Sequence, residues 1–190
     1  MIAAVVLAAG GSTRMGQPKA LLQRPDGRRY VEAIGDCARA GGCQEIVVVV
    51  GPPHGDAIRA ALSASEAAIA WNDHPERGML SSVQAGLAAL TSDVAAALVW
   101  PVDIPFVDVA TVRALVVHSG TIVVPTHNGR GGHPLRLARA HFAEVMTLDP
   151  ERGLKALVDA HTAEVTRLPV ADGAVLVDVD TPDDYARTRD

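Results

Sequence analysis

The stretch LAAGGSTRMGQPK, residues 7–19, decides how the rest of the chain is interpreted. It follows the apolar run of residues 2–6, which has the uninterrupted hydrophobic character of a strand buried on both faces. A glycine-rich bend after such a strand exposes backbone N–H groups, and its small residues let an anion approach them closely. Arg14 and Lys19 add positive charge on either side of Gly16. This combination predicts a site for a polyphosphate.

Two familiar phosphate loops do not fit this stretch. Residues 11–16 match the first six positions of G-x-x-x-x-G-K-[ST], but Gln17 stands where that loop requires lysine. The dinucleotide fingerprint G-x-G-x-x-G is also missing from the sequence. The plain alternative is a flexible glycine turn with solvated charges, so the other motifs must decide.

The length of 190 residues favours a single domain over residues 1–190, and a composition of 48% hydrophobic and 21% charged residues allows a hydrophobic core. A net charge of −5 argues against nucleic acid as a partner. The sequence has neither an apolar run long enough to span a membrane nor the pattern of a signal peptide, so we expect no membrane partner and a cytoplasmic location. Cys37 and Cys43 are then expected to be reduced and structural.

Apolar runs typical of strands alternate with stretches of helical periodicity, which predicts a mostly parallel α/β sheet between two helical layers. Strands are expected at residues 2–7, 45–50, 68–71, 95–100, 121–124, 164–168 and 174–179. Helices are expected at residues 31–40, 56–62, 81–90, 108–118, 142–148 and 154–161, and a last helix starts at Thr181. Such sheets bind ligands beyond the carboxyl ends of their strands.

Acidic residues follow two of the predicted strands. Asp103 lies in the stiff turn WPVDIP, where it either ligates Mg²⁺ or closes the turn. Asp178 and Asp180 lie two residues apart and would share one face of the last strand, where a cation between them would offset their repulsion. The alternative for Asp180 is a role in capping the last helix. The sequence does not distinguish which of the two is the metal ligand.

Polar loops supply the other candidate residues. Asn72 and Gly78 precede a helix whose predicted start carries Ser81 and Ser82, and Ser81-x-x-Gln84 fits a capping box. A helix start with two hydroxyls suits a phosphate or a base edge, although both serines could simply cap the helix. The glycine-rich loop of residues 128–134 carries Arg130 and His133, which suit a phosphorylated acceptor unless Arg130 is merely solvated. The remaining histidines, such as His161, are predicted to be surface or helix-end residues.

These motifs together resemble those of the molybdopterin nucleotidyltransferases. Residues 7–19 look like the signature L-A-A-G-x-[GST]-x-R-[ML]-G-x-x-K, and residues 72–87 look like N-x₅-G-M-x-S-S-[LV]-x-x-G-L. Motifs similar to P-x-D-x-P, G-R-x-G-H-P and D-[IV]-D-T-P-[ED]-D follow in the order expected of that family. The resemblance implies a three-layer α/β/α fold with a Rossmann-like sheet of the nucleotide-diphospho-sugar transferase type. It also implies a nucleoside triphosphate and Mg²⁺ as ligands.

The resemblance also implies roles for individual residues. Arg14, Lys19 and Asp103 would be catalytic, and the metal would be held by Asp103 with help from Asp178 or Asp180. The acceptor would face Arg130 and His133. The nucleotide would lie against residues of the first two motifs, namely Leu7, Ala8, Ala9, Gly10, Gly11, Ser12, Asn72, Gly78, Ser81 and Ser82.

The resulting hypothesis is transfer of a nucleoside monophosphate to a phosphorylated small molecule, with release of pyrophosphate. The resemblance favours molybdopterin as the acceptor, and Ala9 and Pro18 resemble the cytidylyl branch, which favours CTP. A molybdoenzyme or its maturation chaperone is then an expected partner. Two alternatives remain: another small phosphate ester as the acceptor, such as a sugar phosphate or phospholactate, and a non-catalytic nucleotide-binding protein of cofactor maturation.

Overall fold

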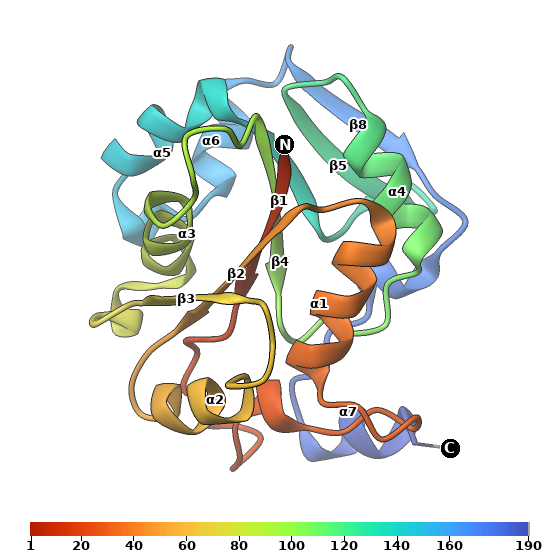
Figure 1. Ribbon diagram of the computed structural model, residues 1–190. Coiled ribbons are helices and arrows are strands. Elements are labelled where there is room, and N and C mark those ends of the chain that lie inside the picture. The colour runs from red at the N-terminus through yellow and green to blue at the C-terminus, as the bar shows by residue number, and fades with distance from the viewer. Residues whose placement is uncertain (190) are drawn as a thin grey trace.

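The computed structural model describes residues 1–189, and its centre is a twisted sheet between two layers of helices (Figure 1). Within the described residues eight strands form this sheet, in the order β3-β2-β1-β4-β7-β5-β6, and β8 pairs with β5. The strands are β1 (Ile2–Leu7), β2 (Glu45–Val50), β3 (Ala68–Trp71), β4 (Ala96–Pro101), β5 (Ile122–His127), β6 (Arg130–Gly131), β7 (Leu135–Ala138) and β8 (Val165–Pro169).

The sheet is parallel except around β7 and β6. Strand β1 pairs in parallel with β2 and β4, and Leu7 at its end lies opposite Pro101. Strand β7 is antiparallel to both β4 and β5, so β5 and its parallel partner β8 run in the same direction as β1. The carboxyl ends of β1, β2, β4, β5 and β8 therefore lie at one edge of the sheet, which is at the bottom of Figure 1. The predicted three-layer, mostly parallel fold class is confirmed.

Two hydrophobic clusters fix the layers. Helices α1 (Tyr30–Gly41) and α4 (Val109–Val117) cover one face, where Ile34 and Leu115 are fully buried. Helices α3 (Met79–Ala88), α5 (Phe142–Thr147) and α6 (Lys155–Ala160) cover the other face. Because Val and Ala in β1 face the two clusters alternately, the strand is buried on both sides, as its uninterrupted apolar run predicts.

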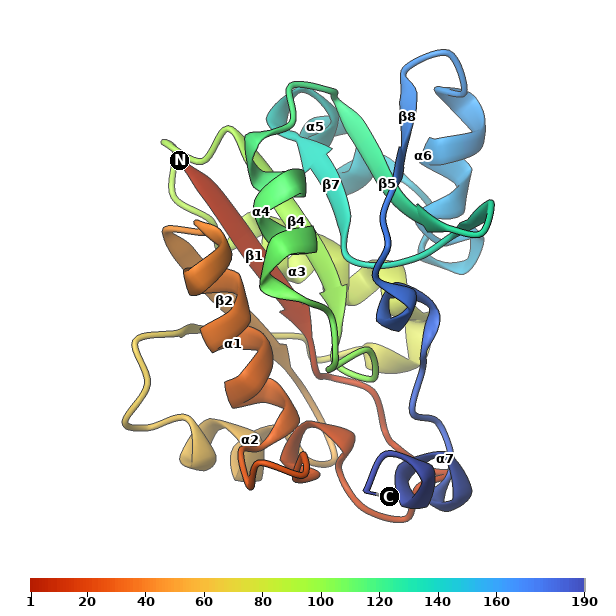
Figure 2. The same ribbon diagram turned by 90° about the vertical axis from the view of Figure 1, so that its right-hand side faces the viewer.

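Two helices lie beyond the carboxyl edge rather than on a face of the sheet. They are α2 (Gly55–Ala61) and α7 (Pro182–Arg187). Figure 2 shows α7 below the sheet, close to the segment that follows β1, and the hydroxyl of Tyr185 donates a hydrogen bond to the carbonyl of Gln23 at 3.0 Å. Helix α7 starts as predicted: Thr181 is its N-cap, Pro182 is the first helical residue, and Thr181 and Asp184 form a capping box.

Two sequence-based predictions of local structure were wrong, and two short strands were not predicted. Residues 174–179 do not form a strand, because Asp172 accepts a hydrogen bond from the Ala174 N–H and starts a 3₁₀ turn over Gly173–Leu176. Helix α3 begins at Met79 with Gly78 as the N-cap, so Ser81 is not the capping residue. Strand β7 was not predicted, and the loop of residues 128–134 contains the short strand β6.

Both cysteines are free and buried, in agreement with the predicted structural role. Burial raises the pKa of Cys37 to about 11 and that of Cys43 to about 12, so both thiols stay protonated near neutral pH. Among the helices of residues 1–189, none combines the length and the apolar character that crossing a membrane requires.

Candidate active site

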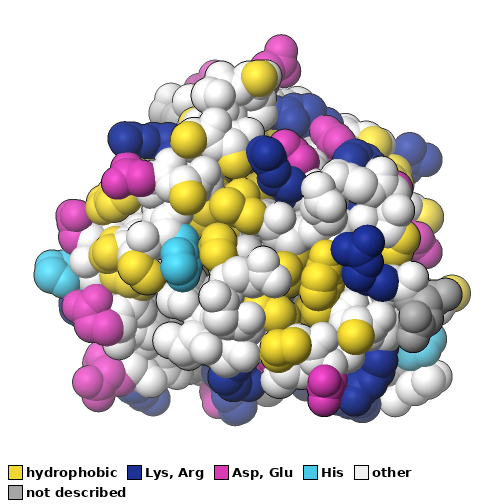
Figure 3. Space-filling view, turned by 90° about the horizontal axis from the view of Figure 1, so that it is seen from below, with side chains coloured by type: hydrophobic (Ala, Val, Ile, Leu, Met, Phe, Trp, Pro, Cys, Tyr) yellow, Lys and Arg dark blue, Asp and Glu magenta, His cyan; other side chains and the backbone are white. Residues whose placement is uncertain are grey.

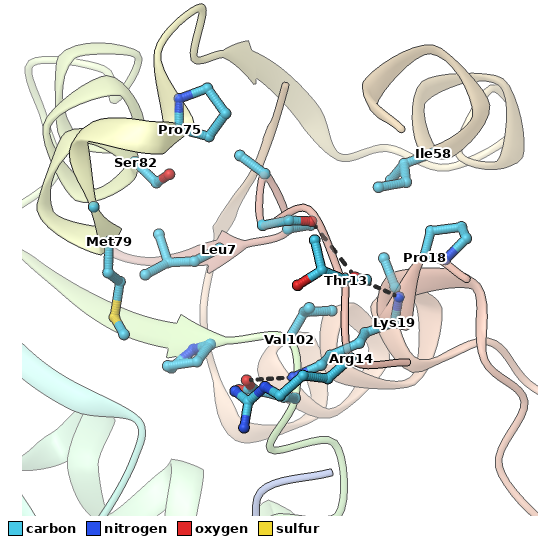
Figure 4. Close-up of a pocket in the computed structure, with 18 residues that line it drawn as sticks. Leu7, Thr13, Arg14, Pro18, Lys19, Ile58, Pro75, Met79, Ser82 and Val102 are labelled. Carbon is cyan, nitrogen blue, oxygen red and sulfur yellow. Dashed lines mark hydrogen bonds and ion pairs between the residues drawn. The ribbon is translucent and has the colours of Figure 1, made fainter. Parts of the chain in front are cut away.

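A pocket of about 260 Å³ opens at the carboxyl edge of the sheet. It is lined by the end of β1 and the bend that follows, by Ile58 of α2, by the start of α3 and by residues 101–103 at the end of β4. In Figure 4, Met79 and Ser82 of α3 lie across the cavity from Thr13 and Lys19. Figure 3 looks onto this end of the molecule, where apolar side chains are exposed and basic and acidic side chains lie beside them.

The bend after β1 is shaped by Ser12. Its backbone adopts a positive φ of 49°, and its carbonyl accepts hydrogen bonds from the N–H groups of Met15 and Gly16. The Ser12 hydroxyl accepts a bond from the Lys19 N–H at 3.1 Å, which closes the bend into a ring. A Cβ at Gly10 would meet no atom within 4 Å. The fold itself therefore does not require glycine at residue 10, and a ligand that approaches the backbone closely explains it better.

Lys19 is the centre of the polar cluster in this pocket. Its ammonium group lies 3.2 Å from a carboxylate oxygen of Asp103 and also contacts Asp180. Arg14 lies 2.8 Å from the other oxygen of Asp180. The Lys19 side chain is only 12% exposed, whereas Arg14 is 67% exposed and extends into solvent. Hydrogen bonding from Lys19 lowers the pKa of Asp180, and the charge of Arg14 adds to this effect, so Asp180 is ionised at neutral pH.

Backbone contacts bring the two carboxylates together from distant parts of the chain. The Val179 N–H donates a hydrogen bond to the Asp103 carbonyl at 2.8 Å, which holds the segment after the 3₁₀ turn against the turn after β4. That turn is itself fixed, because the buried indole N–H of Trp100 donates to the Ile104 carbonyl at 2.8 Å. Asp180 therefore reaches Lys19 from one side while Asp103 reaches it from the other.

Asp178 and Asp180 lie in different environments. Because residues 174–179 are not a strand, the predicted common strand face of Asp178 and Asp180 does not exist. Asp178 is exposed, whereas Asp180 is half-buried against Lys19. The arrangement of side chains thus favours Asp180 over Asp178 as the partner of Asp103.

The start of α3 forms the opposite wall of the pocket. Gly78, Met79 and Ser82 line it, so the N-terminal end of this ten-residue helix, with the positive end of the helix dipole, faces the cavity. Asn72 holds this wall in place, because its buried side-chain amide donates hydrogen bonds to the hydroxyls of Ser81 and Ser82 at 2.9 and 3.0 Å. Asn72 and Ser81 therefore support the wall, and Ser82 is the serine that reaches the cavity.

The glycine-rich loop of residues 128–134 lies at the same edge of the sheet. His133 is half-buried near Asp103 and Asp178; burial lowers its pKa, while the charges of those two carboxylates act in the opposite direction. Arg130 is exposed on β6 and is not among the residues that line the cavity. Gly132 is packed against the Val175 backbone, which ties this loop to the segment leading to Asp180.

Most of the predicted site residues meet in one place. Those that line the cavity or join its ion-pair cluster are Leu7, Ala8, Ala9, Gly10, Ser12, Arg14, Lys19, Gly78, Ser82, Asp103 and Asp180. Gly11, Asn72, Ser81, Arg130, His133 and Asp178 lie outside the lining. Sequence reasoning missed Ile58 and Pro75, which line the cavity as apolar residues and carry no chemical signal, and Met79, whose 57% exposure identifies it only in the folded protein.

The donor set at this pocket fits a divalent metal carried by a polyphosphate. Two carboxylates converge on Lys19, and oxygen is the ligand atom that Mg²⁺ and Mn²⁺ prefer. Lys19, Arg14 and the first turn of α3 supply positive potential on the same side of the sheet. Fold and pocket together are typical of the α/β proteins that bind phosphorylated ligands at the carboxyl edge of a sheet.

The chain belongs to the MobA-like NTP transferase domain family, which matches residues 4–165. It is 23% identical over 190 residues to the molybdenum cofactor cytidylyltransferase of Escherichia coli, with 98% of this chain and 94% of that protein aligned. It is 30% identical to the molybdenum cofactor guanylyltransferase of Xanthomonas euvesicatoria, over 96% of this chain and 92% of the relative. A third relative has another activity: nicotine blue oxidoreductase of Paenarthrobacter nicotinovorans is 32% identical, over 98% and 95% of the two chains.

Solved structures agree with this assignment. The crystal structure of Rv0371c from Mycobacterium tuberculosis superposes with a TM-score of 0.87 at 33% identity and covers 98% of this chain and 96% of that chain. A second structure of Rv0371c, in complex with manganese, gives a TM-score of 0.82 at 31% identity, with 98% and 97% covered. The predicted family resemblance is thus confirmed, and a relative of this chain binds a divalent metal.

Proposed function

We propose that this protein transfers a nucleoside monophosphate from a nucleoside triphosphate to a phosphorylated small molecule and releases pyrophosphate. The observation that carries the proposal is the position of Lys19, held between Asp103 and Asp180 at the mouth of a pocket walled by the glycine bend and the start of α3. Residues 1–190 would work as one domain, since both hydrophobic clusters share one sheet.

The proposed reaction is attack by a phosphate oxygen of the acceptor on the α-phosphorus of the nucleotide. A new P–O bond forms as the bond between the α-phosphorus and the bridging oxygen breaks, and pyrophosphate takes both bonding electrons. The attacking phosphate is already an anion, so the step needs no strong general base. Catalysis then consists of positioning and charge neutralisation.

Each cluster residue has a part in this scheme. Lys19 and Arg14 would neutralise the charge that develops on the leaving pyrophosphate. Asp103 and Asp180 would hold Mg²⁺, which when bound would neutralise phosphate charge. Gly10, the N–H groups around Ser12 and the first turn of α3 would hold the triphosphate, and Ser82 would contact the nucleotide. His133 would face the acceptor side.

The proposal favours CTP as the nucleotide and molybdopterin as the acceptor, because Ala9 and Pro18 resemble the cytidylyl branch and two of the relatives act on the molybdenum cofactor. A molybdoenzyme or its chaperone would then receive the product in the cytoplasm, a setting consistent with two free, buried cysteines. The second candidate is an oxidoreductase, which the nicotine blue relative favours.

A thermal-shift screen with CTP, GTP, UTP and ATP, each with Mg²⁺, tests the nucleotide. A ligand that binds only the folded state raises the melting temperature, and we expect the largest rise with CTP. NADH belongs in the same screen, because an oxidoreductase requires an electron donor. Stabilisation by NADH and by none of the triphosphates would overturn the proposal.

Pyrophosphate release with molybdopterin, a sugar phosphate and phospholactate then tests the acceptor. We expect release with molybdopterin and CTP. Release with another ester would keep the transferase and correct the acceptor. Nucleotide binding without release from any acceptor would support a non-catalytic maturation protein.

A further inference from the structure

A second polar cluster lies at the opposite edge of the sheet, at the top of Figure 1. His141 ends the 3₁₀ turn that follows β7, His161 is the C-cap of α6, and Glu164 directly precedes β8. Because β7 is antiparallel and β8 parallel to β5, the end of β7 and the start of β8 meet at the amino edge of the parallel strands. The cluster is therefore remote from the pocket and independent of the reaction proposed for it.

One nitrogen of this cluster lacks the partner that a buried polar atom requires. His141 is 5% exposed, and its Nε2 atom is buried without a hydrogen-bond partner among the described residues. An unsatisfied buried donor or acceptor destabilises the folded state, so such atoms are rare in native proteins and call for an explanation. The nearest charged oxygen, Oε2 of Glu164, lies 3.5 Å away.

The geometry around this nitrogen matches a metal site. Ligand atoms of His141, His161 and Glu164 lie within 4.8 Å of one another. Nitrogen and oxygen ligands about 2.0–2.1 Å from a tetrahedral zinc ion are about 3.3 Å apart. The distance of 3.5 Å between His141 Nε2 and Glu164 Oε2, and that of 2.9 Å between His161 Nδ1 and Glu164 Oε1, lie on either side of this value.

A fourth residue orients the second imidazole. Oε2 of Glu144 lies 2.7 Å from Nε2 of His161. Nδ1 of the same ring hydrogen-bonds Oε1 of Glu164 at 2.9 Å, so with Nε2 donating to Glu144 a metal ion at the cluster would take the place of the proton on Nδ1. Metal-binding histidines commonly have a carboxylate at the nitrogen away from the metal, which fixes the tautomer and makes the ligand more basic. Glu164 is oriented in turn by the Thr121 hydroxyl, which donates to Oε2 at 3.1 Å.

We propose that His141, His161 and Glu164 form a binding site for a divalent transition metal, with zinc as the preferred ion. Two imidazole nitrogens and one carboxylate are ligands that zinc favours over magnesium, and a water molecule would complete four-coordination. The ion would tie together the chain after β7, the end of α6 and the start of β8. It would also satisfy the buried nitrogen of His141.

Zinc titration of the untagged full-length protein, stripped of metal by a chelator, tests this site. The titration is repeated with Asp103→Asn/Asp180→Asn, which removes the carboxylates of the pocket. We expect both proteins to bind one zinc ion at this site, and His141→Ala to weaken its binding by about 100-fold or more. Glu144→Gln should weaken binding by about 10-fold, as changes to such orienting carboxylates do.

Two further variants keep the test decisive. Glu164→Gln changes a side chain that is 48% exposed, so it reports on the site even if His141→Ala fails to fold. His74→Ala is the matched control, because His74 also lies 3.0 Å from a glutamate, Glu76, but belongs to no three-ligand group. We expect zinc to raise the melting temperature of the wild type and of His74→Ala but not of Glu164→Gln. Undiminished zinc binding by Glu164→Gln, or its loss in Asp103→Asn/Asp180→Asn, would overturn the proposal.

Discussion

The two edges of the sheet use similar charged residues in different ways. At the carboxyl edge, Asp103 and Asp180 already face a cation, because the Lys19 ammonium lies between them. At the amino edge, two glutamates contact His161, and a nitrogen of His141 has no partner within residues 1–189. The contrast shows two ways to arrange metal ligands. Carboxylates that already contact a lysine suit a metal ion that is bound together with phosphate groups. An imidazole without a hydrogen-bond partner suits a metal ion that binds without such groups.

The largest effect is expected from replacing Lys19, the cation that lies between the two carboxylates of the carboxyl edge. Lys19→Ala removes the charge proposed to stabilise the leaving group, and pyrophosphate release should fall by about 100-fold or more. Arg14→Ala should act in the same direction. Lys155→Ala is the matched control, since Lys155 forms an exposed ion pair with Asp159 on α6 and does not line the pocket. A wild-type rate in Lys19→Ala, measured on protein with unchanged circular dichroism, would remove Lys19 from the mechanism.

Substitution of Gly132 tests whether packing holds the segment that leads to Asp180 against the loop of residues 128–134. A Cβ at this position would lie 2.2 Å from the Val175 carbonyl oxygen, so Gly132→Ala should lower the free energy of unfolding by about 2 kcal/mol. Gly10→Ala is the control, because a Cβ there meets no atom within 4 Å. Urea unfolding measures both variants. Equal stabilities would contradict the close contact at Gly132.

The metal requirement distinguishes the acidic residues of the pocket. Asp103→Asn and Asp180→Asn should each raise the Mg²⁺ concentration needed for half-maximal activity by about 10-fold, since each removes a charged oxygen ligand. Asp178→Asn should leave the Mg²⁺ titration nearly unchanged, because Asp178 is exposed and lies outside the ion-pair cluster. A larger effect of Asp178→Asn than of Asp180→Asn would reverse the assignment of the second carboxylate.

The smallest effect is expected at the cap of α7. Thr181→Ala removes the hydroxyl that accepts from the Asp184 N–H, and loss of such a cap costs about 1 kcal/mol. The control is Thr188→Ala, at the other end of the same helix, whose hydroxyl donates to the Tyr185 carbonyl of the preceding turn. Thermal unfolding compares the two. A melting temperature lowered equally in both would mean that the cap contributes nothing special to the segment beside Asp180.

The sequence predicts the first half of the fold well, because long apolar runs and helical periodicity are strong local signals there. Strands β1, β2 and β4 have six residues each, almost all of them buried, and their apolar composition favours a buried strand over other structures. The glycine bend was likewise predictable, because small and basic residues directly after a buried strand indicate a loop of this kind.

The second half depends on tertiary contacts that the sequence does not reveal. The run GAVLVDV looks like a strand, yet Asp172 at its start turns it into a 3₁₀ helix, and a short apolar run does not by itself distinguish the two. Strand β7 was missed because its four residues include Arg136, which is 7% exposed and would be expected at the surface. His141 and His161 were not predicted to meet, because only the fold brings residues before α5 and after α6 together.

The hydrogen bond between the Val179 N–H and the Asp103 carbonyl has a consequence for the order of events during synthesis. Asp180 is added to the growing polypeptide 161 residues after Lys19, the side chain that it finally contacts. A ribosome-bound nascent chain can thus complete β1 to β4 and their helices before the second carboxylate exists. Until the segment around Val179 is bonded to the turn after β4, the Asp180 carboxylate cannot contact Lys19, so the complete ion-pair cluster forms only after residue 180 has been synthesised.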